Sequence, residues 1–471
     1  MDFGLNERNS SFTVLPLAAS DCKTGRRPAP VIQNPKSKIQ NLLSHAGFRR
    51  YAANTSWLFA EQILRMIAGF LVGVWVARYL GPEKFGLFSY ALAFVALFQG
   101  IAKLGLDGII VRDLVKEPEK TLVYLGTSFW LKILGGAVAF LVIAVISYLT
   151  ADNFETFLFI NIVSAGLIFQ SFEVIDFYYQ ATVQAKYISI RKIIQLILLS
   201  CIKIYLVLIK AGLIWFVVVT LFDAISLSIF TYVIYKKQGL PSFFKCFDRG
   251  LGRKLIKDGF PLLLSSIAVM VYMRIDQVMI KNMLGDREVG LYSASVKLVE
   301  IWYFIPMVIT SSLFPAIINA KKISEKVYND RLRKLFVSMI VLSFVISLKI
   351  AIFADYIVYF LYSESYKEAS SILRISIWAS IFVFIGVATS QWFLAENLQK
   401  LSLYRTIYGA IINVILNLFL IPIFGARGAA LATVISYMIA GYLSLFWNKK
   451  TIMLGKNVTL SLFYLFRIRH V

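Results

Sequence analysis

Four basic side chains stand inside long apolar stretches of the sequence, where a charge needs a reason to be present: Arg65, Arg274, Lys297 and Lys349. A charged group within a membrane costs on the order of 2.5 to 3.5 kcal/mol on insertion scales, so it usually faces a cavity or a partner. Guanidinium groups bind phosphate oxygens in pairs, and an ammonium group supplies a point charge. These cations therefore predict a water-filled cavity for an anionic substrate, for which a diphosphate headgroup would be suitable.

Four carboxylates accompany these cations: Glu61, Asp223, Asp276 and Glu300. Glu61 lies four residues before Arg65, and Glu300 lies three residues after Lys297, spacings that place each pair on one helical face. Asp276 lies two residues after Arg274, so these two side chains point to opposite sides and each needs a partner on another helix. We expect the carboxylates to balance charge or to bind a coupling proton or sodium ion, and the sequence leaves this choice open.

Other ionisable residues give weaker signals. Lys132 and Lys203 also lie near the middle of apolar stretches. Residues close to the end of a span can instead extend to the membrane surface, as we expect for Lys103, Asp107, Glu173, Asp176, Arg374 and Glu396. The three cysteines and two histidines are scattered, so the sequence predicts no disulfide framework, no metal site and no cofactor.

The composition places these residues in a membrane. Of the 471 residues, 59% are apolar and 16% are charged, whereas about 25% of the residues in a soluble domain are charged. Apolar stretches of bilayer-crossing length, roughly 20 residues each, recur about twelve times. We therefore predict an all-α polytopic membrane protein, which excludes soluble enzyme and nucleic-acid-binding folds. The expected spans are 55–80, 85–107, 122–149, 155–180, 187–209, 212–235, 259–284, 289–318, 335–361, 369–395, 402–424 and 427–447.

The distribution of Lys and Arg predicts the orientation. Basic clusters such as 236–257 and 321–334 follow the even-numbered spans, while the other loops are short and hold few basic residues. Because positive loops are rarely translocated, both termini are expected in the cytoplasm. The net charge of +23 then reflects topology and attraction to anionic lipids, with no nucleic-acid partner. The expected parts are a disordered N-terminal tail (1–53), an N-lobe (54–235), a basic linker (236–258), a C-lobe (259–447) and a short C-terminal tail (448–471).

An internal repeat relates the two lobes. The segments Leu80–Ser89 and Leu284–Ser293 share the pattern Leu-Gly, four residues, Gly-Leu, an aromatic residue and Ser, at an offset of 204. Each reads as a tight outer hairpin in which the first glycine forms a left-handed helix cap. A second match, at an offset of 214, pairs Ala181, Lys186 and Arg191 with Ala395, Lys400 and Arg405. Repeats of six spans predict two lobes related by a pseudo-twofold axis along the membrane normal, with alternating access at a site between them.

Several segments of the chain resemble a known family. They look like signature regions of the Wzx-type flippases for lipid-linked oligosaccharides, within the multidrug/oligosaccharidyl-lipid/polysaccharide exporter superfamily. The resemblance covers about residues 54–447, and the N-terminal tail departs from the family pattern. The segments are Arg274–Ile280, Leu284–Gly285, Val289–Ala294, Ala77–Pro82, Tyr303–Pro306, Phe314–Ala316 and Gly428–Thr433.

The resemblance implies a two-lobed bundle with a cationic central cavity. Its implied activity is to move an undecaprenyl-diphosphate-linked oligosaccharide from the cytoplasmic to the periplasmic leaflet of the bacterial inner membrane without ATP, for O-antigen, capsule or exopolysaccharide synthesis. Implied partners are membrane lipids and, in the same pathway, a polymerase and glycosyltransferases. Arg65, Arg274, Asp276 and Lys297 carry over as candidate cavity residues.

Three alternatives stay open on the sequence alone. A multidrug exporter of the same superfamily would favour a cavity rich in carboxylates and aromatic residues, so the basic residues count against it. A peptidoglycan-precursor flippase usually has two more spans, whereas the apolar stretch after residue 459 is too short to cross. A glycan polymerase or ligase would need a large external loop, and the short loops argue against an enzyme.

Overall fold

The computed structural model describes residues 45–321 and 324–464, and its long elements are all helices. The expected tail falls mostly on residues 1–44, which lie outside the described residues, whereas the first helix already begins at His45. The helices of the first half of the chain, called the N-lobe below, are α2 (His45–Leu97), α3 (Gln99–Lys103), α4 (Asp107–Lys116), η1 (Pro118–Lys120), α5 (Thr121–Thr150), α6 (Phe154–Phe169), η2 (Gln170–Glu173), α7 (Val174–Ala181), α8 (Ala185–Leu208) and α9 (Leu213–Lys237).

The second half of the chain begins after an irregular linker of residues 238–248, the non-helical part of the expected basic linker. The expected C-terminal tail contains a helix, α19. The elements of the C-lobe are α10 (Arg249–Leu284), α11 (Asp286–Glu300), η3 (Ile301–Tyr303), α12 (Phe304–Lys321), α13 (Glu325–Ile352), α14 (Ala354–Tyr362), η4 (Glu364–Tyr366), α15 (Ala369–Ser376), α16 (Ala379–Ala395), α17 (Gln399–Phe424), α18 (Ala426–Gly441), η5 (Leu443–Phe446) and α19 (Ile452–Tyr464).

The prediction of an all-helical polytopic membrane protein is confirmed. Within the described ranges, ten helical stretches are long and apolar enough to cross a membrane. One of them, Ser56–Leu97, has 42 residues and contains the first two expected spans. Helix α8, expected as the fifth span, is not among the ten and carries four basic residues: Lys186, Arg191, Lys192 and Lys203. The count of twelve spans therefore stays a prediction.

Several expected spans are interrupted rather than continuous. The second ends at Leu97 and continues as the short α3, and the eighth is divided into α11 and α12 by η3. The ninth, expected as one span over 335–361, is two helices, because α13 ends at Ile352 and α14 follows it. These interruptions move some residues that were expected near mid-span to the ends of helices.

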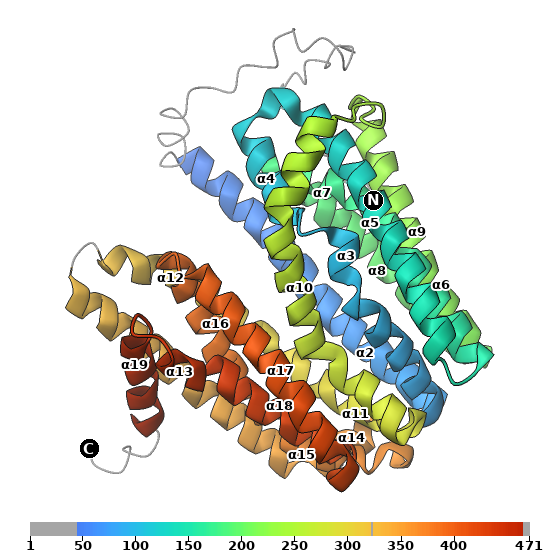
Figure 1. The fold of residues 1–471 in the computed structure, drawn as a ribbon, viewed down its shortest axis with the longest axis vertical. Coiled ribbons are helices and arrows are strands. Elements are labelled where there is room, and N and C mark those ends of the chain that lie inside the picture. The colour runs from blue at the N-terminus through green and yellow to red at the C-terminus, as the bar shows by residue number, and fades with distance from the viewer. Residues whose placement is uncertain (1–44, 322–323, 465–471) are drawn as a thin grey trace, which may run out of the picture.

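The helices form two bundles that meet at one end and separate toward the other (Figure 1). Helix α10 passes between the bundles. Near its start it packs on the N-lobe, since a Cβ added at Gly259 would lie 2.5 Å from the carbonyl oxygen of Leu104. Farther along it packs on the C-lobe, where Tyr272 lies against Gly409 of α17. The end where the bundles meet is called the closed end below, and the opposite end is called the open end.

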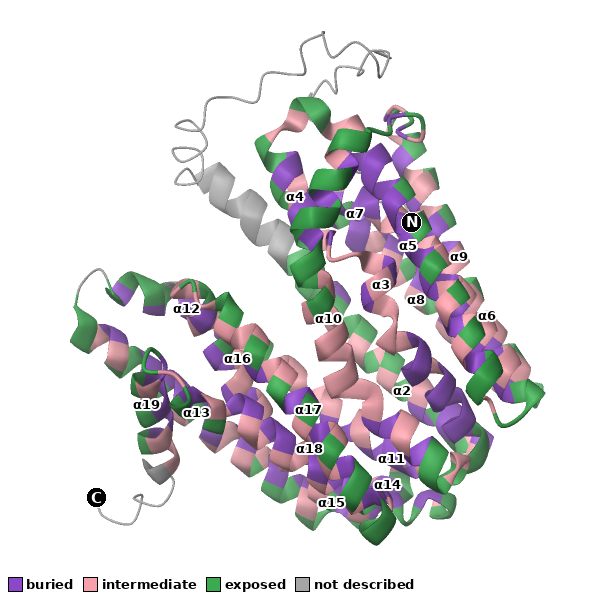
Figure 2. Ribbon diagram, in the orientation of Figure 1, coloured by how far each residue is buried: buried purple, intermediate pink, exposed green. Residues whose placement is uncertain are grey.

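The surface of the bundles is apolar, and the largely apolar interior also contains buried polar residues. Leu134, Leu141 and Tyr148 of α5 are seven residues apart, lie on one helical face and are exposed by 60%, 61% and 77%. Asn413 and Asn417 of α17 are completely buried. Exposed residues recur along the outward-facing sides of the helices (Figure 2). A chain with this distribution is suited to lipid around the bundles and to polar contacts within them.

The two repeated hairpins contact each other at the closed end. Gly81 has φ 73° and ψ 168°, and Gly285 has φ 92° and ψ −178°. Positive φ at both glycines agrees with the prediction, but the extended ψ differs from that of the expected left-handed helix cap. A Cβ at Gly86 would lie 1.8 Å from the carbonyl oxygen of Asp286, and a Cβ at Gly290 would lie 1.8 Å from that of Pro82.

These two glycine contacts are reciprocal, because each member of one pair is 204 residues from its counterpart in the other. Such a reciprocal contact is what a twofold axis between the hairpins would produce, while the pseudo-twofold relation of the whole lobes stays a prediction. Polar contacts reinforce this end. Lys281 Nζ lies 3.1 Å from Asp152 of the N-lobe, and the Tyr366 hydroxyl donates a 2.8 Å hydrogen bond to the carbonyl oxygen of Ala77.

Candidate functional site: a cationic cavity and a buried carboxylate

A cavity of about 530 Å³ opens among helices α2, α6, α8 and α9 of the N-lobe, with one residue from α11 of the C-lobe completing its wall. Its small residues, such as Gly69 and Gly73 of α2, leave the space that larger side chains would fill. Four basic and two acidic residues line it, so its formal charge is positive. These residues are Arg65, Glu173, Lys192, Lys203, Asp223 and Lys297.

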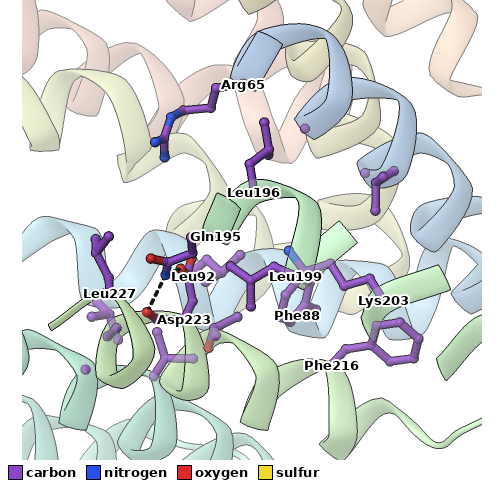
Figure 3. Close-up of a pocket in the computed structure, with 18 of the residues that line it drawn as sticks. Arg65, Phe88, Leu92, Gln195, Leu196, Leu199, Lys203, Phe216, Asp223 and Leu227 are labelled. Carbon is purple, nitrogen blue, oxygen red and sulfur yellow. Dashed lines mark hydrogen bonds between the residues drawn. The ribbon is translucent and has the colours of Figure 1, made fainter. Parts of the chain in front are cut away.

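Arg65 lies on one side of this cavity. Its guanidinium forms a 2.6 Å ion pair with Glu61, which confirms the shared helical face predicted from their spacing of four residues. Figure 3 shows the Arg65 side chain pointing across toward Gln195 and Asp223, which come from α8 and α9. Glu61 is buried, whereas the Arg65 side chain remains 44% exposed. The guanidinium is therefore available to a ligand even while it is paired.

Asp223 is fixed by a neutral neighbour. The Gln195 amide donates a short hydrogen bond to the Asp223 carboxylate and a second bond, of 2.7 Å, to its backbone carbonyl oxygen. No described basic residue forms an ion pair with Asp223. The charge of this carboxylate therefore acts on the cavity as a whole, where it offsets part of the positive charge.

Three basic residues of the cavity, Lys192, Lys203 and Lys297, have no ion-pair partner. In the part of the chain that the structure describes, none of them lies within ion-pair distance of an acidic side chain. Lys297 Nζ lies 4.6 Å from the centre of the Phe85 ring, a cation–π contact that holds the ammonium at the edge of the cavity. Because the basic lining residues outnumber the acidic ones and these ammonium groups form no ion pair, the cavity attracts an anion.

Lys132, also expected near mid-span, has a different role. It is buried, and its ammonium group lies 3.0 Å from Glu173 and 3.2 Å from Asp107. Asp107 in turn lies 3.9 Å from Lys103. This cluster of four charges joins α3, α4, α5 and η2, so Lys132 supports the wall of the cavity rather than lining it.

Two of the predicted C-lobe cations, Arg274 and Lys349, do not line this cavity. Arg274 forms a 3.1 Å ion pair with Glu300 of α11, the partner on another helix that its position required. Lys349 is exposed and lies three residues before the end of α13 at Ile352. The structure therefore brings Arg65, Asp223 and Lys297 together, and it leaves Arg274 and Glu300 as a separate pair and Lys349 at the outer surface.

Asp276 lies in a second polar site, inside the C-lobe. Its carboxylate accepts hydrogen bonds from the Tyr292 hydroxyl (2.5 Å), the Asn417 amide (2.5 Å) and the Thr433 hydroxyl (2.6 Å). The amide of Asn413 lies next to that of Asn417, at 3.2 Å. The Asp276 residue is 3% exposed, and no described basic side chain pairs with it. A buried carboxylate among neutral oxygens can hold a proton or a monovalent cation.

Lys192, Gln195 and Lys203 of α8 line the cavity but were not selected as site residues from the sequence. Lys203 could have been found, because it lies in mid-span and α9 supplies Asp223 on a neighbouring helix. Lys192 and Gln195 gave no signal, since the face that they occupy is set by the packing of α8 against α9.

Comparison with known proteins identifies the family to which the chain belongs. The family model described as "Polysaccharide biosynthesis protein" matches residues 51–321, more than half of the chain, and a MatE model matches residues 261–419. The chain therefore belongs to the polysaccharide biosynthesis protein family, on the flippase side of the MATE-like MOP superfamily. It is a membrane transporter and not an enzyme.

Relatives support this placement. The chain is 25% identical to the membrane protein MJ1068 of Methanocaldococcus jannaschii over 82% of this chain and 81% of the relative. It is 27% identical to the "Probable low-salt glycan biosynthesis flippase Agl15" of Haloferax volcanii over 40% of this chain and 41% of the relative. It is 21% identical to the "Capsular polysaccharide biosynthesis protein CapF" of Staphylococcus aureus over 82% and 96%.

Solved structures share the fold at low identity. The lipid II flippase MurJ in an inward closed conformation matches with a TM-score of 0.64 and 16% identity, over 89% of this chain and 93% of that chain. A multidrug resistance MATE transporter matches with a TM-score of 0.62 in its inward-facing conformation (17% identity; 83% and 95% covered) and 0.53 in an outward-facing conformation (18% identity; 86% and 96%).

Proposed function

We propose that this transporter is a flippase for a lipid-linked oligosaccharide, with undecaprenyl diphosphate as the carrier, and that it acts by alternating access. The observation that carries the proposal is a cavity lined by Lys192, Lys203 and Lys297, none of which forms an ion pair in the described residues, together with Arg65. A diphosphate would bring the missing negative charge to these groups. The names of the glycan flippase and capsular polysaccharide relatives support a glycan as the remainder of the substrate.

In the proposed cycle the structure represents the state open to the cytoplasm. The bundles separate at the end that carries the linker between the lobes, which lies within the expected basic linker of residues 236–258, and basic loops are expected on the cytoplasmic side. The higher TM-score to the inward-facing MATE structure than to the outward-facing one supports the same assignment. The headgroup would enter the cavity from this side while the lipid tail stays in the membrane. Opening the closed end would then release the headgroup to the other leaflet.

We propose that Asp276 couples this cycle to an ion gradient. Protonation, or a sodium ion held by the carboxylate, the Asn417 amide oxygen and the Thr433 hydroxyl, would neutralise a charge that is otherwise buried without a cation. The structure supports this role through the burial of Asp276 and through Asn417 Oδ1, which is buried without a hydrogen-bond donor. Glu61, Asp223 and Glu300 are the other carboxylates that we propose to balance charge.

The first test is flipping by the full-length protein in liposomes. The substrate is a fluorescent undecaprenyl-diphosphate oligosaccharide, and the readout is its access to an impermeant quencher in the outer leaflet. The Lys203→Gln, Lys297→Gln double variant should lower the initial rate by at least about tenfold, because each lost charge-assisted contact is worth roughly 1.5 to 3 kcal/mol. Lys349→Gln, which removes an exposed lysine outside the cavity, is the matched control and should flip at the wild-type rate.

Two results would contradict the proposal. If the double variant flips the substrate at the wild-type rate, Lys203 and Lys297 do not contribute to substrate binding. Export of cationic dyes by the wild type, without movement of the lipid-linked glycan, would assign the protein to the multidrug exporters. The coupling ion is tested in the same liposomes by imposing a sodium or a proton gradient. Asp276→Asn should remove the response to whichever gradient drives the wild type.

A further inference from the structure

The second repeat match contains two arginines at equivalent positions, Arg191 in the N-lobe and Arg405 in the C-lobe. Arg191 is 2% exposed, and its guanidinium forms a 2.8 Å ion pair with Asp176 as well as a hydrogen bond to Thr231. This arginine is neutralised within its own lobe. It has the structural role expected of a buried ion pair that joins α7, α8 and α9.

Arg405 lacks the corresponding carboxylate. The offset of 214 that relates the two arginines also relates Asp176 to Ser390, so the acidic residue is replaced by serine in the C-lobe. The Arg405 guanidinium donates hydrogen bonds to the Ser390 hydroxyl, to the Thr389 hydroxyl at 2.7 Å and to the carbonyl oxygen of Gly386 at 3.2 Å. It also lies 4.7 Å from the centre of the Phe393 ring.

All of these partners are neutral. Across residues 45–321 and 324–464, no acidic side chain forms an ion pair with Arg405, although the residue is only 8% exposed. Burying an unpaired charge is strongly unfavourable, and neutral acceptors compensate it only in part. The C-lobe therefore retains the cation of the repeat without its counterion, which leaves a place for an external anion.

Arg405 also lies on the side of α17 that faces α10, the helix that passes between the lobes. It is one helical turn before Gly409, at which α17 touches Tyr272 of α10. From that point α10 continues toward the N-lobe, where Ser266 and Ile267 pack against Gly100, while α17 stays in the C-lobe. Figure 1 shows α10 and α17 diverging toward the open end. Arg405 is thus close to the junction from which the two lobes separate.

We propose that Arg405 is a second anion-binding residue of the substrate pathway, contributed by the C-lobe, and that it binds a phosphate or carboxylate oxyanion of the translocated molecule. This inference rests on the proposed function and deepens it. The substrate would be held at two places, with its headgroup at the cavity lysines and an oxyanion at Arg405. That oxyanion is either part of the diphosphate or an acidic group on the glycan.

The test uses three variants of the full-length protein in nanodiscs. Arg405→Gln removes the charge and Arg405→Lys retains it. Ser390→Asp places a carboxylate where the N-lobe has one, so it should neutralise Arg405 internally and raise the melting temperature. Lys349→Gln is the control for a distant loss of charge. Binding is measured by calorimetry with geranylgeranyl diphosphate, with octyl glucuronide and with neutral octyl glucoside.

We expect Arg405→Gln and Ser390→Asp to bind one anionic probe at least about tenfold more weakly than the wild type, and Arg405→Lys to remain closer to it. Weaker binding of geranylgeranyl diphosphate assigns the oxyanion to the phosphates, and weaker binding of octyl glucuronide assigns it to an acidic sugar. A purely structural arginine would instead give a more stable Ser390→Asp protein with unchanged affinities, and that result would overturn the inference.

The variants also separate this inference from the proposed function. If Arg405→Gln fails to fold, Ser390→Asp and Arg405→Lys still give the comparison, because both keep a cation at residue 405. Failure of the wild type to bind either anionic probe would overturn the proposed function and this inference together. Normal diphosphate binding and flipping with wild-type affinities in the Arg405 and Ser390 variants would overturn the inference alone.

Discussion

Substitution of Gly290 by alanine should force the lobes apart at the closed end. A Cβ at this position would lie 1.8 Å from the carbonyl oxygen of Pro82, whereas ordinary contact begins near 3.4 Å. The atom that it meets belongs to the backbone of the other hairpin, so it cannot turn away as the end of a side chain could. The hairpins must then separate by about 1.6 Å.

The size of the shift is set by how much the added methyl group destabilises the state in which the hairpins touch. Overpacking a well-packed contact costs roughly 1 to 3 kcal/mol. The cost falls only on the state in which the hairpins touch, because the state open at this end has no such contact. The equilibrium between the two states should therefore shift toward the latter by about 5- to 150-fold.

Spin labels across the closed end can measure this shift. We suggest labels at Lys84→Cys and Glu364→Cys, both exposed, in a protein whose native cysteines are replaced by serine. Gly290→Ala should move the distance distribution to longer values. Gly86→Ala should do the same, since its Cβ would lie 1.8 Å from the carbonyl oxygen of Asp286. The two substitutions together should be less than additive, because the first already separates the contact that the second disturbs.

The matched control is Gly108→Ala, which adds a Cβ with no neighbouring atom within 4 Å. It should leave the distances and the melting temperature unchanged. Wild-type distances in Gly290→Ala would refute the reasoning, since they would show that the hairpins accept the methyl group without separating.

Three further predictions concern charges. Lys132→Met should lower the free energy of unfolding by roughly 1 to 3 kcal/mol, seen as a lower melting temperature, because it removes the buried cation shared by Glu173 and Asp107, whose carboxylates are partly exposed. Asp152→Asn should lengthen the spin-label distances only slightly, because Asp152 is 64% exposed and its pairing with Lys281 is screened by water, which limits its worth to about 1 kcal/mol. The Arg287 guanidinium lowers the pKa of Glu368 below its ordinary value of 4.5. This stabilisation is complete above that value and is lost as the pH falls through the lowered pKa, so an Arg287→Gln protein should lose less stability than the wild type on acidification below pH 4.5.

The sequence predicted contacts within one helix better than contacts between helices. The pairing of Glu61 with Arg65 follows from a spacing of four residues and is present in the structure. The requirement that Arg274 and Asp276 find partners on other helices was also predictable, but Glu300, Asn417 and Thr433 could be identified as those partners only from the packing.

Lys349 shows why part of the site was not predictable. Hydropathy is continuous over residues 335–361, so one long span was expected and Lys349 fell in its middle. The chain instead ends α13 at Ile352 and begins α14 at Ala354, which places Lys349 at a helix end where its ammonium group can reach the membrane surface. Conversely, Lys203 joined the cavity because α8 turns this face toward α9, a rotation that no local pattern specifies.

The reciprocal contacts of Gly86 and Gly290 affect how well the closed end blocks the leakage of ions across the membrane. While the open end admits water to the cavity, the closed end is the barrier that must hold back protons and small ions. A seal made by glycine against a backbone carbonyl leaves no space for a file of water molecules, and the attraction across it falls steeply once the surfaces part by an ångström. Such a seal is either intact or lost, with little stability in between. A carrier closed in this way would leak few ions in its substrate-free state, so it would dissipate little of the membrane potential.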